Sequence, residues 1–340
     1  MERPSDCTSQ MMTALFCALA LQLKYLTITL PDKEVYPMTC IQFGWSLPSG
    51  PPEGMSRNAY MEGVQKGFEL IKGHFDSFWF VDHLQSDNDP LLAGWTALTY
   101  FAALHPELTF GHVVLCQSFR NPALLAKMAT TAQFLSGGRF ILGIGAGWKE
   151  DEYRAYGYDF PPAGTRVEEL VEALQIIRAM WHDERATVNG KHYHVVDAWC
   201  EPKPDPLPTI MVGAFKPRML RVAARYADWW NVSWMGIDTY RMYVEEFERA
   251  CTEVQRDPAT VRRAWYGGCV CGQTEAAVKK LNTNNYSGER AFIGTPAQLI
   301  EQMQQFVDLG VDYFMLLSGG FPDLTTLELL VSEVMPALNR

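Results

Sequence analysis

The stretch RFILGIGAGW, residues 139–148, contains the pattern that decides the fold class. Its apolar half predicts a short buried strand over residues 140–144, and glycines alternate at the end of that strand at Gly143, Gly145 and Gly147. The dinucleotide fingerprint of a Rossmann fold needs the spacing G-x-G-x-x-G and a helix that begins at once. Here the spacing is G-x-G-x-G and an aromatic residue follows, so the stretch excludes a nicotinamide-binding Rossmann domain.

Strands and helices alternate on both sides of this stretch. From Ile41 onward, short apolar runs alternate with amphipathic segments, a pattern that predicts βα units and a parallel sheet. The predicted strands are residues 41–46, 77–81, 108–116, 140–144, 209–212, 228–232, 263–271 and 313–317. Helices are predicted between them, for example over residues 58–72, 122–135, 166–181, 217–226, 239–254 and 296–309. We therefore expect an α/β protein with a (β/α)8 TIM barrel over residues 38–340, with a doubly wound open sheet as the alternative.

Three segments interrupt the alternation and are expected to be insertions. They are residues 148–164, residues 189–208, which begin with a hairpin-like Gly190 to His194, and the polar residues 272–290. Loops of this length that are ordered are usually lids or binding loops. We expect these insertions to set the specificity of the protein.

The first 37 residues do not resemble the rest of the chain. The apolar run from Met11 to Leu30 is broken by polar residues, which is poor for a signal peptide and too interrupted for a membrane span. We expect residues 1–37 to be a poorly ordered extension and the protein not to associate with a membrane.

Charge and cysteine content limit the class of partner. The net charge is -10 and Lys and Arg are spread along the chain, so a nucleic-acid partner is not expected. The eight cysteines lack the spacing of a disulfide framework, which favours a reduced, cytoplasmic location.

Cys269 and Cys271 lie on an apolar run and are predicted to be buried thiols. His192 and His194 point the same way on a predicted strand, but without a third ligand no metal site is expected.

An acid and an imidazole follow the second predicted strand. The apolar run of residues 78–81 continues directly into Asp82 and His83. Ligands of α/β barrels bind at the C-terminal ends of the strands, and a carboxylate beside a histidine can orient the ring for proton transfer. We predict that Asp82 and His83 are catalytic, the alternative being a histidine that only caps a loop.

A second group of residues suits an anion. The strand over residues 209–212 ends in Gly213, Ala214, Phe215 and Lys216, and Pro217 begins a helix. Backbone N–H groups and the positive end of a helix make such a junction a phosphate site, to which the lysine adds a charge. The alternative is an ordinary βα loop.

The glycine stretch itself offers backbone without side chains. Gly145, Ala146 and Gly147 would let a flat ring or a phosphate tail approach the end of the strand. The alternative is that these glycines only allow a neighbouring helix to pack closely.

Taken in order along most of the chain, these residues resemble the luciferase-like family of flavin and deazaflavin oxidoreductases. The matching positions are Arg120, Asn121, Pro122, Leu125, Ala126, Lys127, Leu135 to Phe140, Leu142, Gly143, Gly145, Gly147, Trp148, Glu152, Tyr153, Gly157, Ala223 to Asp228 and Phe292 to Pro296. The run of Gly145 to Trp148 together with Asp82 and His83 most resembles the branch that uses coenzyme F420, an 8-hydroxy-5-deazaflavin, in place of FMN.

The resemblance implies a cofactor site and an activity. It places Asp82 and His83 beside the deazaflavin and a small-molecule substrate, and a bulge with a non-prolyl cis peptide at Val113-Val114 behind the ring. The stretches 145–147 and 213–216 then hold the cofactor tail and its phosphate. The implied protein is an F420-dependent oxidoreductase that transfers a hydride and forms a homodimer.

Two other functions stay open on the sequence. One is an FMN-dependent monooxygenase that uses oxygen and a separate flavin reductase, and the other is a barrel that binds the cofactor without catalysis. Some sugar-phosphate-oxidising members have a glutamate where Trp148 stands, so that acid must be replaced here by Glu150, Asp151 or Glu152 if it is needed. Trp148 would offer a stacking surface, which favours an apolar or aromatic substrate.

Overall fold

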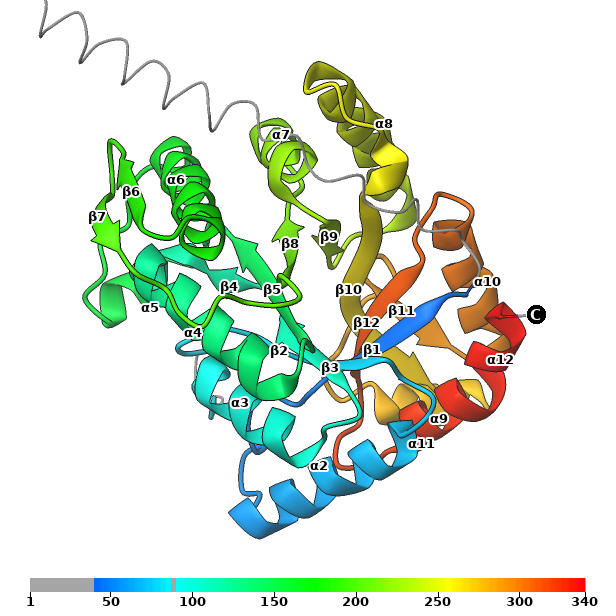
Figure 1. Ribbon diagram of the computed structural model, residues 1–340. Coiled ribbons are helices and arrows are strands. Elements are labelled where there is room, and N and C mark those ends of the chain that lie inside the picture. The colour runs from blue at the N-terminus through cyan, green and yellow to red at the C-terminus, as the bar shows by residue number, and fades with distance from the viewer. Residues whose placement is uncertain (1–39, 87–89, 340) are drawn as a thin grey trace, which may run out of the picture. The chain divides into compact units, whose positions relative to one another are not determined.

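The computed structural model describes residues 40–86 and 90–339, and the predicted N-terminal extension lies outside the described residues. A closed barrel of parallel strands forms the centre of the described chain, and helices surround it (Figure 1). The barrel strands are β1 (Gln42–Ser46), β2 (Ser77–Phe80), β3 (Thr109–His112), β5 (Phe140–Gly145), β8 (Thr209–Gly213), β9 (Trp229–Ser233), β10 (Arg262–Cys271) and β12 (Tyr313–Ser318). The pairings of β12 with β1 and of β9 with β10 close the ring. The predicted barrel is therefore confirmed, and the open-sheet alternative is wrong.

Helices return the chain from each strand to the next. They include α2 (Arg57–Ile71), α3 (Gly94–Leu104), α4 (Pro122–Ser136), α6 (Ala163–His182), α7 (Pro217–Tyr226), α8 (Ile237–Glu253) and α10 (Pro296–Val307). The helices α11 (Thr325–Leu329) and α12 (Met335–Leu338) follow the last strand. Local sequence fixes the ends of α4 in particular. The Asn121 side chain accepts hydrogen bonds from the N–H groups of Ala123 and Leu124, Pro122 occupies the first turn, and Gly137 ends the helix at a φ of 66°.

Large side chains fill the inside of the barrel. Trp79, Ile141, Met211, Trp229 and Tyr313 come from five different strands and pack in one buried cluster. A TIM barrel is packed in this way along its axis, so its ligands bind above the strands rather than inside the ring.

The strand predicted over residues 108–116 is interrupted. After β3, the peptide bond Val113-Val114 is cis, and the chain resumes as β4 (Leu115–Cys116), which pairs with Ile144 and Gly145 of β5. The cis bond that the resemblance implied is present at that position.

Each of the three insertion segments contains regular structure. Residues 148–164 include α5 (Glu150–Ala155), and residues 189–208 include part of an antiparallel hairpin of β6 (Ala186–Asn189) and β7 (His194–Ala198). The segment 272–290, predicted only as a polar insertion, contains α9 (Glu275–Leu281), whose N-cap Thr274 accepts a hydrogen bond from the Ala277 N–H. The following β11 (Ala291–Gly294) pairs with the end of β10.

Two further observations concern the cysteines and the prediction about membranes. Cys269 and Cys271 are fully buried, as predicted. Within the described ranges, no helix is both long and apolar enough to span a lipid bilayer.

Candidate active site

A cavity of about 970 Å³ opens at the C-terminal ends of the barrel strands. It brings together all the residues that the sequence singled out for catalysis and cofactor binding. These residues are Asp82, His83, Val113, Val114, Gly145, Ala146, Gly147, Gly213, Ala214, Phe215 and Lys216. They come from the ends of β2, β3, β5 and β8, which are neighbours in the sheet, so the order of the strands explains why segments distant in sequence meet here.

Glycines form one wall of the cavity beside the cis peptide. A Cβ atom on Gly145 would lie 2.9 Å from Val114 Cγ2, and one on Gly213 would lie 3.1 Å from the same methyl group. Both positions therefore leave little room for a side chain. The surface beside Val114 is bare backbone, which fits the face of a flat ring system.

Gly147 continues this wall in a conformation that favours glycine. Its φ is 75°, and an added Cβ would lie 2.0 Å from the Tyr153 hydroxyl and 2.7 Å from Cys116 Sγ. The hydroxyl and the thiol lie 2.9 Å apart. Burial raises the pKa of Cys116 to about 11, so its thiol is neutral near pH 7 and is a poor nucleophile.

Asp82 is held away from His83. Its carboxylate accepts two hydrogen bonds of 2.7 Å from the Arg120 guanidinium and one of 3.0 Å from the Cys116 N–H. Burial raises the pKa of the Asp82 carboxyl, and the Arg120 cation acts in the opposite direction. The expectation that Asp82 orients His83 is thus corrected, because the Asp82 carboxylate is engaged by Arg120.

The carboxylate that contacts His83 belongs to Glu152. His83 Nδ1 lies 2.6 Å from Glu152 Oε1, and the Leu84 N–H donates to Glu152 Oε2 at 3.1 Å. The Glu152 side chain is 1% exposed, whereas that of His83 is 36% exposed. Adjacent residues of an extended chain point to opposite sides, which explains why Asp82 and His83 have different partners.

The two other acids of α5 do not reach the imidazole. Glu150 pairs with Arg154 at 2.8 Å near the surface, and Asp151 pairs with Lys149 at 3.1 Å. Of the three acids that the sequence offered together, the structure brings only Glu152 to His83. A helix of six residues is too short for its periodicity to reveal which acid is buried.

Cations gather at another part of the cavity, at the start of α7. Lys216 is the N-cap residue and its side chain forms no capping hydrogen bond, and Arg218 also lines the cavity. Backbone N–H groups in the first turn of a helix attract anions, so this end suits a phosphate or a carboxylate.

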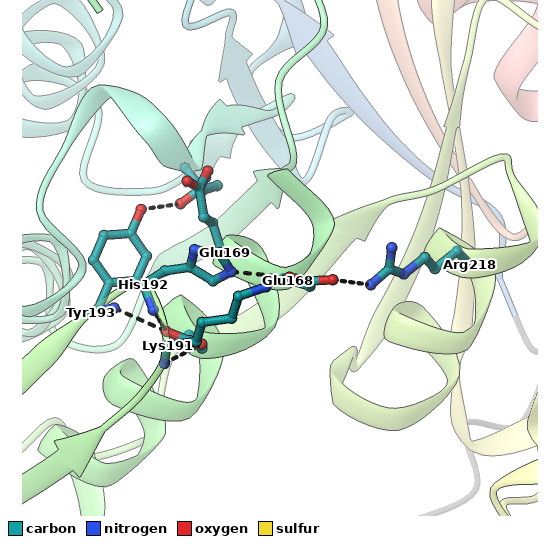
Figure 2. Close-up of polar contacts among 8 residues, drawn as sticks. Glu168, Glu169, Lys191, His192, Tyr193 and Arg218 are labelled. Carbon is teal, nitrogen blue, oxygen red and sulfur yellow. Dashed lines mark hydrogen bonds and ion pairs between the residues drawn. The ribbon is translucent and has the colours of Figure 1, made fainter. Parts of the chain in front are cut away.

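A charged cluster anchors Arg218 to the hairpin insertion. Figure 2 shows Glu168 of α6 between Arg218, Lys191 and His192, at 2.9, 3.0 and 3.1 Å. These partners, Arg218 first, lower the pKa of Glu168 to about 2. His192 thus contacts the carboxylate that also holds Arg218, which lines the cavity, while His194 begins β7 and is exposed.

Aromatic and aliphatic side chains line the remaining wall. Trp148 is 70% exposed and meets the His83 ring edge-on at 5.9 Å, and Trp234 packs against Tyr286 at 5.2 Å. Leu317 also lines this part of the cavity. The sequence identified Trp148 but gave no signal for Trp234 and Tyr286, which come from different loops.

Comparison with known proteins finds a family that matches most of the chain. The family profile described as luciferase-like monooxygenase matches residues 41–287. A phthiodiolone/phenolphthiodiolone dimycocerosates ketoreductase of Mycobacterium sp. (strain JLS) is 31% identical over 259 residues, which cover 68% of this chain and 65% of that relative. The chain therefore spans slightly less than two thirds of that protein's length.

Two further similarities involve proteins named for F420. An F420-dependent glucose-6-phosphate dehydrogenase of Kineococcus radiotolerans is 34% identical over 172 residues, covering 48% of this chain and 50% of that relative. The solved structure of an F420-dependent secondary alcohol dehydrogenase in complex with an F420-acetone adduct has a TM-score of 0.77 at 21% identity. It covers 88% of this chain and 100% of that one. At this identity the structural match establishes the shared fold.

Proposed function

The chain belongs to the luciferase-like monooxygenase family, and from this premise we propose that it transfers a hydride between coenzyme F420 and an apolar ketone or secondary alcohol. The observation that carries the proposal is a partly exposed histidine, His83, anchored by a buried carboxylate in the same cavity as the glycine wall. A proton must move whenever a hydride converts a ketone to an alcohol or the reverse. His83 is the side chain proposed to move it.

The residues of the cavity fit the chemical parts of F420. The bare backbone at Gly145 and Gly213 suits a flat ring, and Lys216 at the start of α7 suits the phosphate of the tail. When bound, a deazaflavin supplies hydride chemistry with little oxygen reactivity, because a carbon atom replaces the flavin N5. The names of two relatives also include F420.

His83 would act as a general acid in reduction and as a general base in oxidation. Its ring lines the cavity and is partly exposed, so a substrate oxygen can approach it. Positioned acid–base groups contribute about 10² to 10⁴ in rate. The neutral Cys116 and the engaged Asp82 are less suited to this step.

The wall around His83 favours an apolar substrate over a phosphorylated sugar. Two cations line this part of the cavity, and both are engaged. Lys149 donates to the Gln85 carbonyl at 2.8 Å and pairs with Glu152 at 3.3 Å, and Arg166 donates to the Gly147 carbonyl and stacks on Phe160 at 4.0 Å. A phosphate group would have to break these contacts. Relatives named as a ketoreductase and a secondary alcohol dehydrogenase support a carbonyl or carbinol group.

The experiment is a pair of measurements on the purified protein. Titration with F420 and with FMN should show tighter binding of F420. With F420 as the cofactor, the protein should turn over apolar ketones or secondary alcohols from a test series, and it should not turn over glucose 6-phosphate. Tight binding of FMN together with oxygen consumption would refute the proposal and favour the monooxygenase. Binding of F420 without turnover of any ketone or alcohol would favour a non-catalytic barrel.

A further inference from the structure

Glu152 occupies an unusual position for a charged side chain. It lies in the first turn of α5, its side chain is 1% exposed, and it lines the same cavity as His83. Burying a carboxylate is costly unless hydrogen bonds and opposite charge compensate it. The contacts of this carboxylate therefore indicate its purpose.

Both oxygens of Glu152 are used, and both hold the segment that carries His83. Oε1 lies 2.6 Å from His83 Nδ1, and Oε2 accepts the Leu84 N–H at 3.1 Å. One carboxylate thus fixes the imidazole and the backbone of the next residue at the same time. The helix α5 and the loop after β2 are joined at this point, although the two partners are 69 positions apart in the sequence.

Lys149 gives this carboxylate a cationic partner. Its ammonium lies 3.3 Å from Glu152 Oε1 and 3.1 Å from Asp151, and it donates to the Gln85 carbonyl at 2.8 Å. Oε1 faces the Lys149 ammonium and Oε2 accepts the Leu84 N–H, so both oxygens of Glu152 act as acceptors. An ionised carboxylate can only accept hydrogen bonds, so the His83 nitrogen that faces it must be the donor.

The other groups around His83 do not compete for Nδ1. The Asp82 carboxylate is engaged by Arg120, and Trp148 meets the ring edge-on without a hydrogen bond to it in the described part of the chain. The charged groups nearest to His83 are therefore Glu152 and Lys149 from the β5 to α5 segment, and Asp82 of its own loop is turned to Arg120.

On the basis of the proposed function, we propose that Glu152 is a positioning residue that holds His83 as the Nδ1–H tautomer and leaves Nε2 for the substrate. A histidine that must exchange a proton with substrate through one nitrogen needs its other nitrogen fixed, because the wrong tautomer presents a donor where an acceptor is required. Glu152 acts only through His83. A carboxylate orients a catalytic imidazole in the same way in hydrolases. In this protein the acid and the histidine follow different strands of the barrel.

The first test is made on the ligand-free protein and does not require activity. Histidine side-chain ¹⁵N NMR distinguishes a protonated Nδ1 from a protonated Nε2, and the signal of His83 is assigned among the seven histidines by its loss in His83→Asn. Above the pH at which His83 loses its charge, the wild type should show the Nδ1–H tautomer. A predominant Nε2–H form in the wild type would overturn the inference, whatever the cofactor proves to be.

The second test uses Glu152→Gln and a matched control. Glu152→Gln should lose the tautomer preference and lower kcat on the order of tenfold or more while KM changes little, because the imidazole is no longer held for proton transfer. The affinity for F420 should change less than about twofold. Glu150→Gln, a change of the same chemistry in the same turn, should leave all of these readouts unchanged.

The outcomes separate this inference from the proposed function. A Glu152→Gln protein with the wild-type tautomer and the wild-type kcat would reduce Glu152 to a structural residue and overturn the inference. If no substrate is turned over, the NMR result still decides the role of Glu152, while the proposed function alone fails. If Glu152→Gln does not fold, the inference is decided by the His83 tautomer in the wild type and in Glu152→Asp. The Glu152→Asp protein keeps the carboxylate and should retain the Nδ1–H tautomer.

Discussion

The substitution Asp82→Asn should destabilise the fold more than any other single polar change at the cavity. Asp82 accepts two hydrogen bonds of 2.7 Å from Arg120, and the side chains are 2% and 16% exposed. Asparagine keeps one acceptor but presents an amide NH₂ to the guanidinium, so Arg120 loses its counter-charge in a buried setting. Removing one partner of a buried pair costs about 3 to 5 kcal/mol, and we expect about 3 kcal/mol because the bond to the Cys116 N–H can survive.

The assay is urea denaturation followed by fluorescence, together with the melting temperature. The shift is about 2 to 4 °C for each kcal/mol in a domain of 150 to 250 residues and smaller in a larger one, so the melting temperature of this barrel should fall by at most roughly 6 to 12 °C. The slope with urea should not change, since the extent of unfolding is the same. Glu62→Gln is the control, because Glu62 pairs with Lys66 at 2.8 Å on an exposed helix face and such pairs add little. A loss of less than about 1 kcal/mol for Asp82→Asn would refute the reasoning that Arg120 depends on this carboxylate.

The remaining predictions concern catalysis, the cofactor, the hairpin and the substrate. His83→Ala should lower turnover by about 10² to 10⁴ with F420 affinity nearly unchanged, and turnover within about threefold of wild type would show that another group moves the proton. Gly213→Ala, whose Cβ would be tight but tolerable at 3.1 Å, should leave the melting temperature in place and weaken F420 binding on the order of tenfold in a fluorescence titration. Lys216→Ala should weaken the same binding about threefold or more, and the loss should shrink at high salt; unchanged affinity in both variants would place the cofactor elsewhere. Because the pKa of Glu168 is lowered from its ordinary value of 4.5 to about 2, its contribution to stability is present above pH 4.5 and is lost as the pH falls through about 2. The difference in melting temperature between wild type and Glu168→Gln should therefore disappear between these two pH values. A difference that stays constant would contradict the ion-pair cluster. Trp148→Ala should raise KM for aromatic ketones about threefold to tenfold with kcat retained, and a fall in kcat alone would argue against a binding wall.

The barrel could be predicted because its signals are local. Apolar runs end in glycines or polar residues at intervals that suit βα units, and the alternation of Gly143, Gly145 and Gly147 excluded a nicotinamide-binding Rossmann domain from ten residues of sequence. The same local logic placed the residues of the cavity, since the ends of parallel strands meet at one end of a barrel.

The partners of the site residues could not be predicted, because they depend on contacts between distant segments. Arg120 is 38 positions from Asp82, and Glu152 is 69 positions from His83. The extended chain directs the two side chains to opposite sides, but nothing in the neighbouring residues Asp82 and His83 reveals which partners they meet. The helix α9 was missed for another reason, since its seven residues make only about two turns and a polar segment follows them.

The proposed function is tested most directly by a single turnover in air. Wild-type protein loaded with reduced F420 is mixed with an excess of an apolar ketone, and the deazaflavin absorbance is followed with and without dissolved oxygen. The account predicts that the cofactor is oxidised only when the ketone is present, in equal amount to the alcohol formed, and at the same rate in both gas conditions. Oxidation that requires oxygen and does not require the ketone, or a failure to bind F420 while FMN binds, would contradict it.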